Sequence, residues 1–426
     1  MHVLCFFQAA SIALPAESCG SRSLQAAVHL HWITQSAPPN GHAGAWPLRG
    51  GSCVVRCIGQ LPVGAMADRG ISTQANGRAG RRQLLARWCH RTGMLPLLRR
   101  LRGVSRHDLR VLAYHRVLES TEPHGFSFDT ELISASADAF REQMAHLRRH
   151  FSPMRFGEVL ERIERGRTLP KDAVLVTFDD GYDDNYRVAF PILRELDMSA
   201  MFFVSTGHID SGRPYAYDWL VHMICSTRAD RLRAPELGLD RALGATLAER
   251  RAQAAELLDR LKGLRDERQA ALIARLEVEW NMPRRQGHPD CRPMTWEQLR
   301  EMHRDGMEVG SHGVHHRMLA KLPRERMVAE VKESKATLER ELGVPVDVLS
   351  YPVGGPDAFD HATVEAVRAA GFRMACSYVS GAGIVAPRTL YALPRLPVER
   401  QMDRAWFEAM VAMPEVFGYA SRLRTG

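Results

Sequence analysis

The sequence predicts an α/β protein with a parallel sheet, most economically a (β/α) barrel, interrupted by a helical insertion at about residues 213–292. Short apolar runs typical of buried strands alternate with segments of helical spacing over some 300 residues. The stretch from about 230 to 280 is rich in Arg, Leu, Ala and Glu and has helical character without a strand signal. Polar side chains able to bind metal or move protons follow four of the expected strands, where the active sites of such barrels lie.

Strand and helix signals alternate in order through the first half of this region. Three runs rich in apolar and β-branched residues are expected to form buried strands: residues 111–114, 173–178 and 200–204. Residues 137–149 place apolar side chains at helical spacing, and Ser136 or Asp138 can cap that helix. Another helix is expected after the Asp-Asp-Gly sequence at 179–181 and ends near Leu196.

The alternation resumes after the insertion. Helical spacing predicts three further helices, at residues 296–304, 323–342 and 361–370. Short apolar runs predict three further strands, at residues 307–310, 346–351 and 372–376. Because a strand that returns to the same sheet through a helix lies parallel to its predecessor, these units favour a barrel spanning residues 110–420.

The overall composition is typical of globular proteins. Hydrophobic residues make up 45% and charged residues 25% of the chain, which excludes a wholly disordered or fibrous protein. No run approaches the roughly 18 uncharged apolar residues that span a bilayer. The net charge of +8 comes from one segment, because residues 78–110 hold ten Arg and a single acid, Asp108. The bulk of the chain is therefore not expected to bind nucleic acid.

The first 77 residues are expected to lie outside the barrel. They show no sustained period of 2 or 3.6, which predicts a disordered segment or translation from a start codon placed too far upstream, with Met66 as the real start. Residues 3–14 resemble the apolar core of a signal peptide. No positively charged residue precedes this run, so no convincing signal peptide is predicted.

Residues 78–109 predict a basic amphipathic helical segment. Between residues 81 and 102, leucines and one tryptophan are interleaved with arginines, and the helix is expected to break near Gly93 and Pro96. Such a helix can lie on an anionic membrane surface. The alternative is a helix that packs its leucine face on the domain behind it.

Two adjacent carboxylates, Asp179 and Asp180, follow the second predicted strand. Their mutual repulsion and desolvation cost free energy unless a cation or a proton offsets them. Gly181 allows the backbone to turn sharply, so that one carboxylate can bind a metal while the other faces a substrate. Taken alone, the pair is also consistent with an acidic turn that caps the next helix.

Two histidines, His312 and His316, follow the strand predicted at residues 307–310. Histidines at i and i+4 can converge on one ion, and neutral imidazole is a good ligand for Zn²⁺. His315 is expected to point elsewhere, and a histidine-rich surface loop is the alternative. With Asp180, the two histidines offer two nitrogen donors and one oxygen donor, which is the pattern of a catalytic zinc site with positions left for water.

These motifs resemble the polysaccharide deacetylase family, also called the NodB homology domain or carbohydrate esterase family 4. The similarity rests on Thr-Phe-Asp-Asp-Gly at 177–181, Ser-His-x-x-x-His at 311–316 and Tyr-His-Arg-Val at 114–117, and it covers about residues 110 to 400. The resemblance implies a distorted (β/α) barrel. It also implies hydrolysis of N-acetyl groups on an acetylated polysaccharide or glycan by metal-activated water, with Zn²⁺ or another divalent metal as cofactor.

The resemblance also implies roles for individual residues. Asp179 is expected to be the catalytic base, and Asp180, His312 and His316 the metal ligands. Residues 349–354 resemble a further family motif, which implies that the backbone near Tyr351 and Pro352 binds the substrate oxyanion.

Two later motifs depart from the family pattern. Ser350 stands where an arginine is common, and Arg395 stands where a histidine often supplies the general acid. A branch of the family that acts on poly-N-acetylglucosamine takes its acid from a histidine after the first strand. This similarity makes His115 the expected acid, against the alternative of a structural histidine at the barrel mouth.

Two other functions remain open at this point: a catalytically degenerate barrel that only binds glycan, and an amidase of the same fold that acts on a non-sugar substrate. A phosphoryl-transfer enzyme of the haloacid dehalogenase type is disfavoured because it requires Asp-x-Asp spacing. The expected partner is a glycan and not a nucleic acid, with peripheral membrane association through residues 81–102. Both the bacterial cell envelope and the cytoplasmic face of the membrane are consistent with this sequence.

Overall fold

The structure is a computed structural model of the 426-residue chain, and it describes residues 72–123 and 125–419. The predictions for residues 1–71, including the apolar run at 3–14 and the start at Met66, lie outside the described residues. Among the described helices, none is both long enough and apolar enough to span a bilayer.

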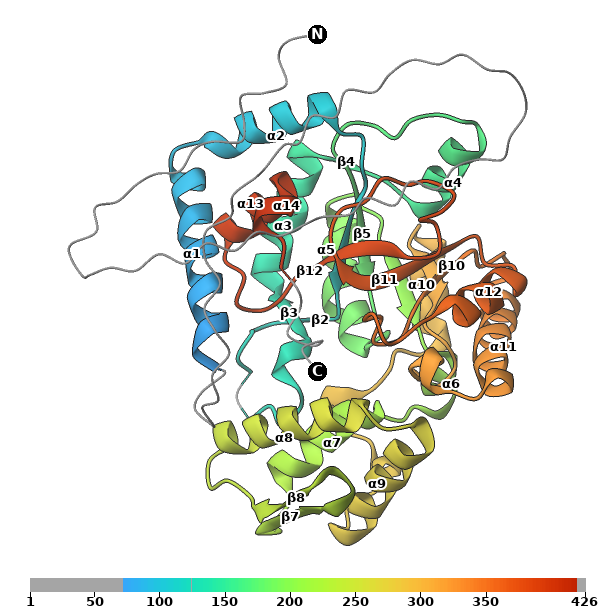
Figure 1. Cartoon of the computed structure of the whole chain (residues 1–426). Helices are drawn as coiled ribbons and strands as arrows, with labels where there is room; N and C mark the ends of the chain where they lie inside the picture. The colour runs from blue at the N-terminus through green and yellow to red at the C-terminus, as the bar shows by residue number, and fades with distance from the viewer. Residues whose placement is uncertain (1–71, 124, 420–426) are drawn as a thin grey trace, which may run out of the picture. The chain divides into compact units, whose positions relative to one another are not determined.

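Seven parallel strands close into a barrel, which confirms the predicted fold class (Figure 1). In chain order the strands are β1 (Arg110–Tyr114), β5 (Ala173–Phe178), β6 (Met201–Val204), β9 (Glu308–Ser311), β10 (Val348–Ser350), β11 (Met374–Ser380) and β12 (Leu393–Pro397). Their spatial order is β1-β12-β11-β10-β9-β6-β5, and β5 pairs back to β1. The short β4 (Ser152–Pro153) pairs with the start of β5.

Helices surround the barrel. Five of them were predicted and end within one or two residues of the expected positions: α3 (Ala137–His150), α5 (Phe190–Glu195), α10 (Trp296–Arg304), α11 (Arg324–Leu342) and α12 (His361–Ala369). Four others were not predicted from the sequence: α4 (Phe156–Glu164), α6 (Thr206–Ser211), α13 (Arg404–Ala412) and α14 (Pro414–Phe417). Of the two candidate caps of α3, Ser136 is the one used, because its side chain accepts a hydrogen bond from the Ala139 amide. A π-helical turn, η2 (Asn185–Ala189), leads into α5.

Small elements fill the connections between these strands and helices. The strands β2 (Arg116–Leu118) and β3 (Ile133–Ser136) form a two-stranded parallel sheet next to the 3-10 turn η1 (Thr130–Leu132). A further 3-10 turn, η6 (Leu319–Lys321), precedes α11.

Two helices precede the barrel, α1 (Ser72–Arg91) and α2 (Met94–Ser105), and both pack against α13. The break between them falls at Gly93, which has a φ of 68° that favours glycine. Pro96 does not break the helix, because it lies in the first turn of α2, where its missing N–H is not needed.

The predicted insertion is a subdomain whose apolar core is shared with residues of the barrel connections, among them Phe128 and Tyr182. It contains α7 (Ala216–Ser226), β7 (Arg231–Ala234), η3 (Pro235–Leu237), β8 (Leu239–Ala242), α8 (Leu247–Lys262), α9 (Asp266–Glu279), η4 (Arg284–Gln286) and η5 (Pro289–Cys291). Its apolar core includes Trp219, Leu257 and Leu272. The prediction of helix without strand from 230 to 280 was wrong for the hairpin β7–β8, whose charged outward residues hide the strand alternation.

Side-chain alternation along the strands decides which residues point into the barrel. Val111 on β1, Leu175 on β5 and Phe203 on β6 belong to the cluster inside the barrel, whereas their neighbours Leu112 and Val176 pack outward against the helices. Because successive residues of a strand point to opposite faces, every second position continues into the interior. This period places the residues that follow the strands at the barrel mouth.

Candidate active site

Five polar residues continue the inward register of the strands and meet at the mouth of the barrel. The residues are His115 after β1, Asp179 after β5, His312 after β9, Ser350 at the end of β10, and Arg395 within β12. All but His115 are at least 98% buried. Period-2 alternation therefore converts positions far apart in sequence into one polar layer above the apolar interior.

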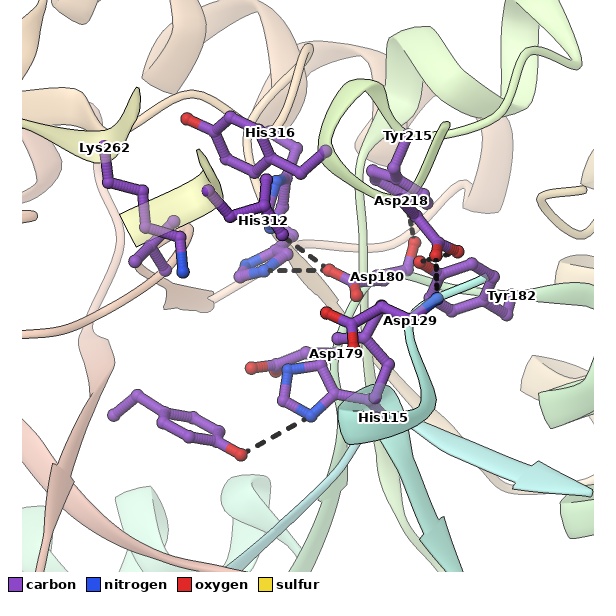
Figure 2. Close-up of a pocket in the computed structure, with 15 residues that line it drawn as sticks. His115, Asp129, Asp179, Asp180, Tyr182, Tyr215, Asp218, Lys262, His312 and His316 are labelled. Atoms are coloured by element: carbon purple, nitrogen blue, oxygen red, sulfur yellow. Dashed lines mark hydrogen bonds and ion pairs between the residues drawn. The ribbon is translucent and has the colours of Figure 1, made fainter. Parts of the chain in front are cut away.

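The turn after β5 separates the two adjacent carboxylates. Asp180 and Gly181 both have left-handed backbones, with φ values of 74° and 77°. At Gly181 a side chain is excluded twice, because a Cβ there would also lie 2.7 Å from Val204 Cγ1. The hydroxyl of Tyr215, from the insertion, donates to the Asp180 carbonyl oxygen and fixes this conformation. Asp179 consequently faces the barrel interior while Asp180 is directed to the histidines (Figure 2).

The loop that carries the histidines is held by Glu330 of α11. One Glu330 oxygen accepts from the amides of Val314 and His315, at 2.8 and 2.9 Å, and the other lies 2.6 Å from His315 Nδ1. His315 thus points away from the site, as expected from the sequence. His316 has a φ of 54° and so adopts the left-handed conformation, as does Asp180. Strained backbones of this kind cluster at functional sites.

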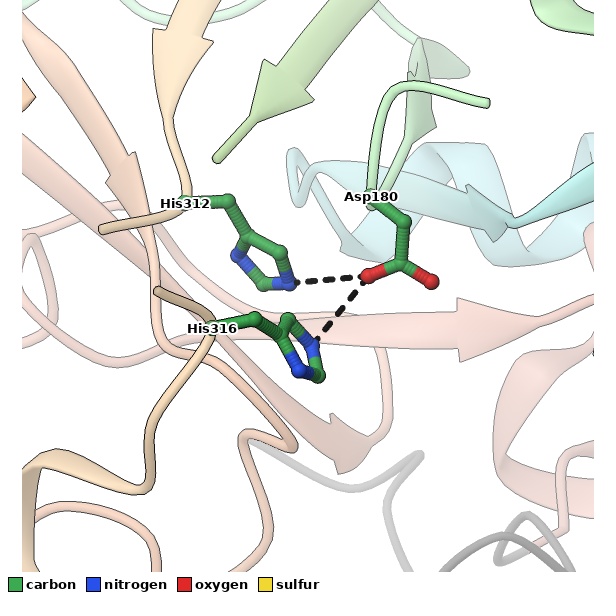
Figure 3. Close-up of side chains that lie close together, drawn as sticks. All are labelled: Asp180, His312 and His316. Atoms are coloured by element: carbon green, nitrogen blue, oxygen red, sulfur yellow. Dashed lines mark ion pairs between the residues drawn. The ribbon is translucent and has the colours of Figure 1, made fainter. Parts of the chain in front are cut away.

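Asp180, His312 and His316 converge on one point (Figure 3). Asp180 Oδ1 lies 3.5 Å from His312 Nε2 and 3.2 Å from His316 Nε2. His312 Nδ1 lies 2.8 Å from the carbonyl oxygen of Ser350. Because a carbonyl oxygen can only accept a hydrogen bond, Nδ1 is the donor and carries the hydrogen. In a neutral ring, Nε2 then directs a lone pair at a carboxylate oxygen.

This arrangement fits a divalent ion. Asp180 Oδ1 is buried and accepts no hydrogen bond from any described residue. Two donors that are each about 2.1 Å from one ion with a tetrahedral angle lie about 3.4 Å apart, which matches the two separations above. Burial alone would raise the pKa of Asp180, but His316 and His312 hold that pKa well below its ordinary value, so the carboxylate is ionised. The donor set therefore suits Zn²⁺ or a similar ion.

Asp179 is held by an arginine that the sequence did not identify as functional. Arg395 donates from Nη1 to Asp179 Oδ1 at 2.7 Å and from Nη2 to Oδ2 at 2.6 Å. The same guanidinium donates to the Ser377 carbonyl at 2.8 Å and to Ser350 Oγ at 2.9 Å. Burial alone would raise the pKa of Asp179, but Arg395 lowers it below its ordinary value, with a further contribution from His312.

The two departures from the family motifs, at Ser350 and Arg395, are therefore linked. The guanidinium of Arg395 reaches the space beside Ser350, where the family commonly has an arginine, and Ser350 is small enough to leave room for it. The alternation of Leu393 and Arg395 could have shown from the sequence that Arg395 points into the barrel. This strand was not predicted because residues 393–397 contain two prolines, which are uncommon in central strands.

His115 lines the pocket beside Asp179 (Figure 2). Its Nδ1 lies 3.5 Å from the Tyr378 hydroxyl, and its backbone is fixed through Ser134 and Asn185. Burial lowers the pKa of His115, while Asp180 and Asp179 act to raise it. A histidine with this environment is a stronger acid than a free one when it is protonated.

Tyr351 and Pro352, assigned to oxyanion binding by the resemblance, do not line the pocket. The Tyr351 amide donates to the Cys376 carbonyl at 3.1 Å and the Tyr351 hydroxyl donates to the Tyr391 carbonyl, so both groups are engaged elsewhere. Proline has no N–H to offer. The residue that lines the pocket at this point is Val353, which has an unusual φ of 64° for a β-branched side chain.

The insertion forms the opposite wall of the pocket with Tyr215, Tyr217, Asp218, Leu258 and Lys262. None of these residues belongs to a sequence motif, so they were not predicted to lie at the site. The pocket has a volume of about 80 Å³. A second cavity of about 330 Å³ shares Tyr215, Tyr217 and His316 with it and extends along α9.

Comparison with known proteins identifies a family. Residues 166–375 match the family model described as polysaccharide deacetylase. A 75-residue stretch is 37% identical to the poly-beta-1,6-N-acetyl-D-glucosamine N-deacetylase of Escherichia coli (strain K12) and represents 17% of this chain. The matched stretch covers only 11% of that relative's length.

Solved structures with related folds include two at low sequence identity. The Streptococcus pyogenes deacetylase PplD in complex with acetate is 18% identical with a TM-score of 0.47, over 71% of this chain and 96% of that chain. The IcaB structure from Ammonifex degensii is 20% identical with a TM-score of 0.44, over 72% of this chain and 96% of that chain.

Proposed function

We propose that this chain, which belongs to the polysaccharide deacetylase family, is a metal-dependent hydrolase that removes N-acetyl groups from an acetylated glycan. The observation that carries this proposal is the buried Oδ1 of Asp180, which accepts no hydrogen bond from a described residue and faces two imidazole nitrogens, beside a second carboxylate that takes no part in that cluster.

Asp180, His312 and His316 would hold the ion, and the nitrogen-rich donor set favours Zn²⁺. A divalent ion in such a site polarises the acyl oxygen and makes water more acidic. Asp179 accepts the proton of the attacking water, because its lowered pKa keeps it ionised and each oxygen retains a lone pair beside its bond to Arg395. The bidentate contact fixes the direction in which this base points.

His115 delivers the proton that the departing amine needs. It lies across the pocket from the histidine pair and shares the pocket with Asp179 (Figure 2). Val353 lines the pocket, and we assign its backbone N–H as the donor to the developing oxyanion, in place of Tyr351 and Pro352.

The substrate is proposed to be a polymer or oligosaccharide of N-acetylglucosamine, as in the printed name of the Escherichia coli relative. The small pocket would receive the acetamide and part of one sugar. The larger cavity along α9 would receive neighbouring sugars, since Tyr215 and Tyr217 line both spaces and aromatic rings present flat apolar surfaces.

Acetate release tests the proposal directly. The purified chain, loaded with zinc, should release acetate from N-acetylglucosamine oligomers, lose this activity on chelation and regain it when zinc is restored. Asp179→Asn serves as the matched control, because it keeps the shape of the base. Metal binding without acetate release from any acetylated glycan would instead support a glycan-binding barrel.

A further inference from the structure

The outward faces of α1 and α2 carry an unusual number of large apolar side chains. Six residues are 45–75% exposed: Leu84, Leu85, Trp88, Leu97, Leu101 and Val104. Only six other large hydrophobic residues are exposed in the whole described part of the chain, and these are scattered. We call the first six the α1–α2 stripe.

Packing on the barrel does not account for this stripe. The inner faces of the two helices are already apolar and buried, through Ala86 and Cys89 of α1 and Leu95 of α2. The exposed residues are spaced i, i+1 and i+4 on α1 and i, i+4 and i+7 on α2, so each helix presents a second apolar face directed outward. Apolar patches of this kind mark a surface that contacts another molecule or a membrane.

The charged side chains that α1 and α2 themselves carry are all basic. Residues 72–107 contain no Asp or Glu. Arg81 and Arg91 flank the stripe on α1, Arg100 lies within it on α2, all three are exposed, and none forms an ion pair with a described residue. By contrast, the half-exposed Arg87 pairs with Asp403, and the buried Arg102 pairs with Asp108 and Glu415.

We propose that the α1–α2 stripe docks this protein on an anionic lipid surface. The leucines and Trp88 would enter the boundary between headgroups and acyl chains, while Arg81, Arg91 and Arg100 contact lipid phosphates. In Figure 1, α2 lies at the end of the barrel away from the insertion, so docking leaves the pocket beneath the insertion accessible. This inference does not rest on the proposed enzymatic function.

Vesicle binding by the full chain tests this inference. Co-sedimentation is measured with vesicles of phosphatidylcholine alone and with vesicles that also contain phosphatidylglycerol. We expect binding to the anionic vesicles, weak binding to the neutral ones, and weaker binding to the anionic vesicles as the salt concentration is raised. Equal binding to both compositions, or no binding to either, would overturn it.

Two double variants separate the apolar and the charged contributions. Leu97→Gln with Leu101→Gln should weaken binding at least about tenfold because two buried side chains are lost. Arg91→Gln with Arg100→Gln should weaken it about fivefold for each arginine. The controls are Val278→Gln and Arg268→Gln, which alter exposed residues on α9 and should leave binding unchanged.

The same samples also show whether the stripe binds a second copy of the chain instead of a lipid surface. The wild type should remain monomeric in sedimentation without vesicles, and circular dichroism should show all variants folded. A wild type that self-associates through the stripe, with monomeric stripe variants and no vesicle binding, would overturn the proposal. Equal losses in the α9 controls would also overturn it.

Discussion

The two walls of the pocket differ in how they are built. The barrel wall includes His115, Asp179 and His312, whose positions follow from strand register, and Asp179 is paired with the buried Arg395. The insertion wall comes from helices that pack on the barrel connections and contributes aromatic rings, Asp218 and Lys262. We therefore assign the proposed chemistry to the barrel wall and the glycan contacts to the insertion wall, which is coupled to the barrel through the hydrogen bond from the Tyr215 hydroxyl to the Asp180 carbonyl.

The largest effect is expected from His316→Ala on the barrel wall. This change removes one of two nitrogen donors, so both bound zinc and acetate release should fall to the detection limit. Elemental analysis and turnover measured on the same sample check this expectation. A variant that keeps stoichiometric zinc would contradict the assignment of this ligand.

Asp179→Asn should separate metal binding from catalysis. Asn cannot accept the proton of water, so turnover should fall by about 10²–10⁴-fold while zinc content stays normal. Activity like that of the wild type would remove Asp179 from the role of base. A loss of zinc in this variant would show that both carboxylates bind the ion.

Arg395→Lys should reduce turnover by about 10–100-fold with metal retained, because lysine keeps the charge but cannot bind a carboxylate in bidentate fashion. Arg395 lowers the pKa of Asp179, so its replacement should raise that pKa. The acid limb of the pH–rate profile should therefore move to higher pH. Ser350→Ala is the matched control, because it removes one hydrogen bond to Arg395 Nη2 and leaves the contact with Asp179 intact. If the acid limb moves equally far in this control, the bidentate pair has no specific role.

On the insertion wall, Lys262→Met should affect binding more than chemistry. The substitution keeps the length and apolar stem of the side chain but removes the charge that faces the pocket (Figure 2). KM for the glycan should rise several-fold while kcat changes less than twofold. Steady-state kinetics decide the point, and a loss confined to kcat would place this residue in the chemistry.

The smallest effect on turnover, with a clear effect on stability, is expected at His222 in the insertion core. Burial lowers the pKa of His222 to about 4, against about 6.5 in an unfolded chain. Folding therefore favours the neutral ring, and the contribution of His222 to the free energy of unfolding is fully present above pH 6.5. This contribution, at most about 3 kcal/mol, is lost as the pH falls towards 4.

His222→Gln should flatten this dependence. Unfolding of the wild type and the variant is compared between pH 4 and 7, because His146 and His208 also have pKa values near 4 and contribute equally to both proteins. Identical slopes would show that the insertion core does not titrate through this residue.

The barrel could be predicted from sequence because its signals are local. Residues 173–178 form a continuous apolar run that ends at two carboxylates, and the i and i+4 spacing of His312 and His316 is visible within five residues. These motifs and the order of strands and helices led to the confirmed fold class, and the structure brings the three expected metal donors together.

Long-range contacts could not be predicted in the same way. Arg395 and Asp179 are 216 residues apart, and no periodicity links them. The hairpin β7–β8 escaped notice because its charged outward residues resemble a helix surface. The contribution of Tyr217 and Lys262 to the pocket depends on how the insertion folds over the barrel, which the sequence pattern of either part alone does not determine.

The central claim is that Asp180, His312 and His316 hold one divalent ion and that Asp179 stays outside its coordination sphere. Diffraction from zinc-loaded crystals at the zinc absorption edge tests this claim most directly. We predict a single strong anomalous peak within about 2.0–2.2 Å of Asp180 Oδ1 and of the two Nε2 atoms, with Asp179 still bound to Arg395. A peak elsewhere, or a zinc ion coordinated by Asp179, would contradict the account.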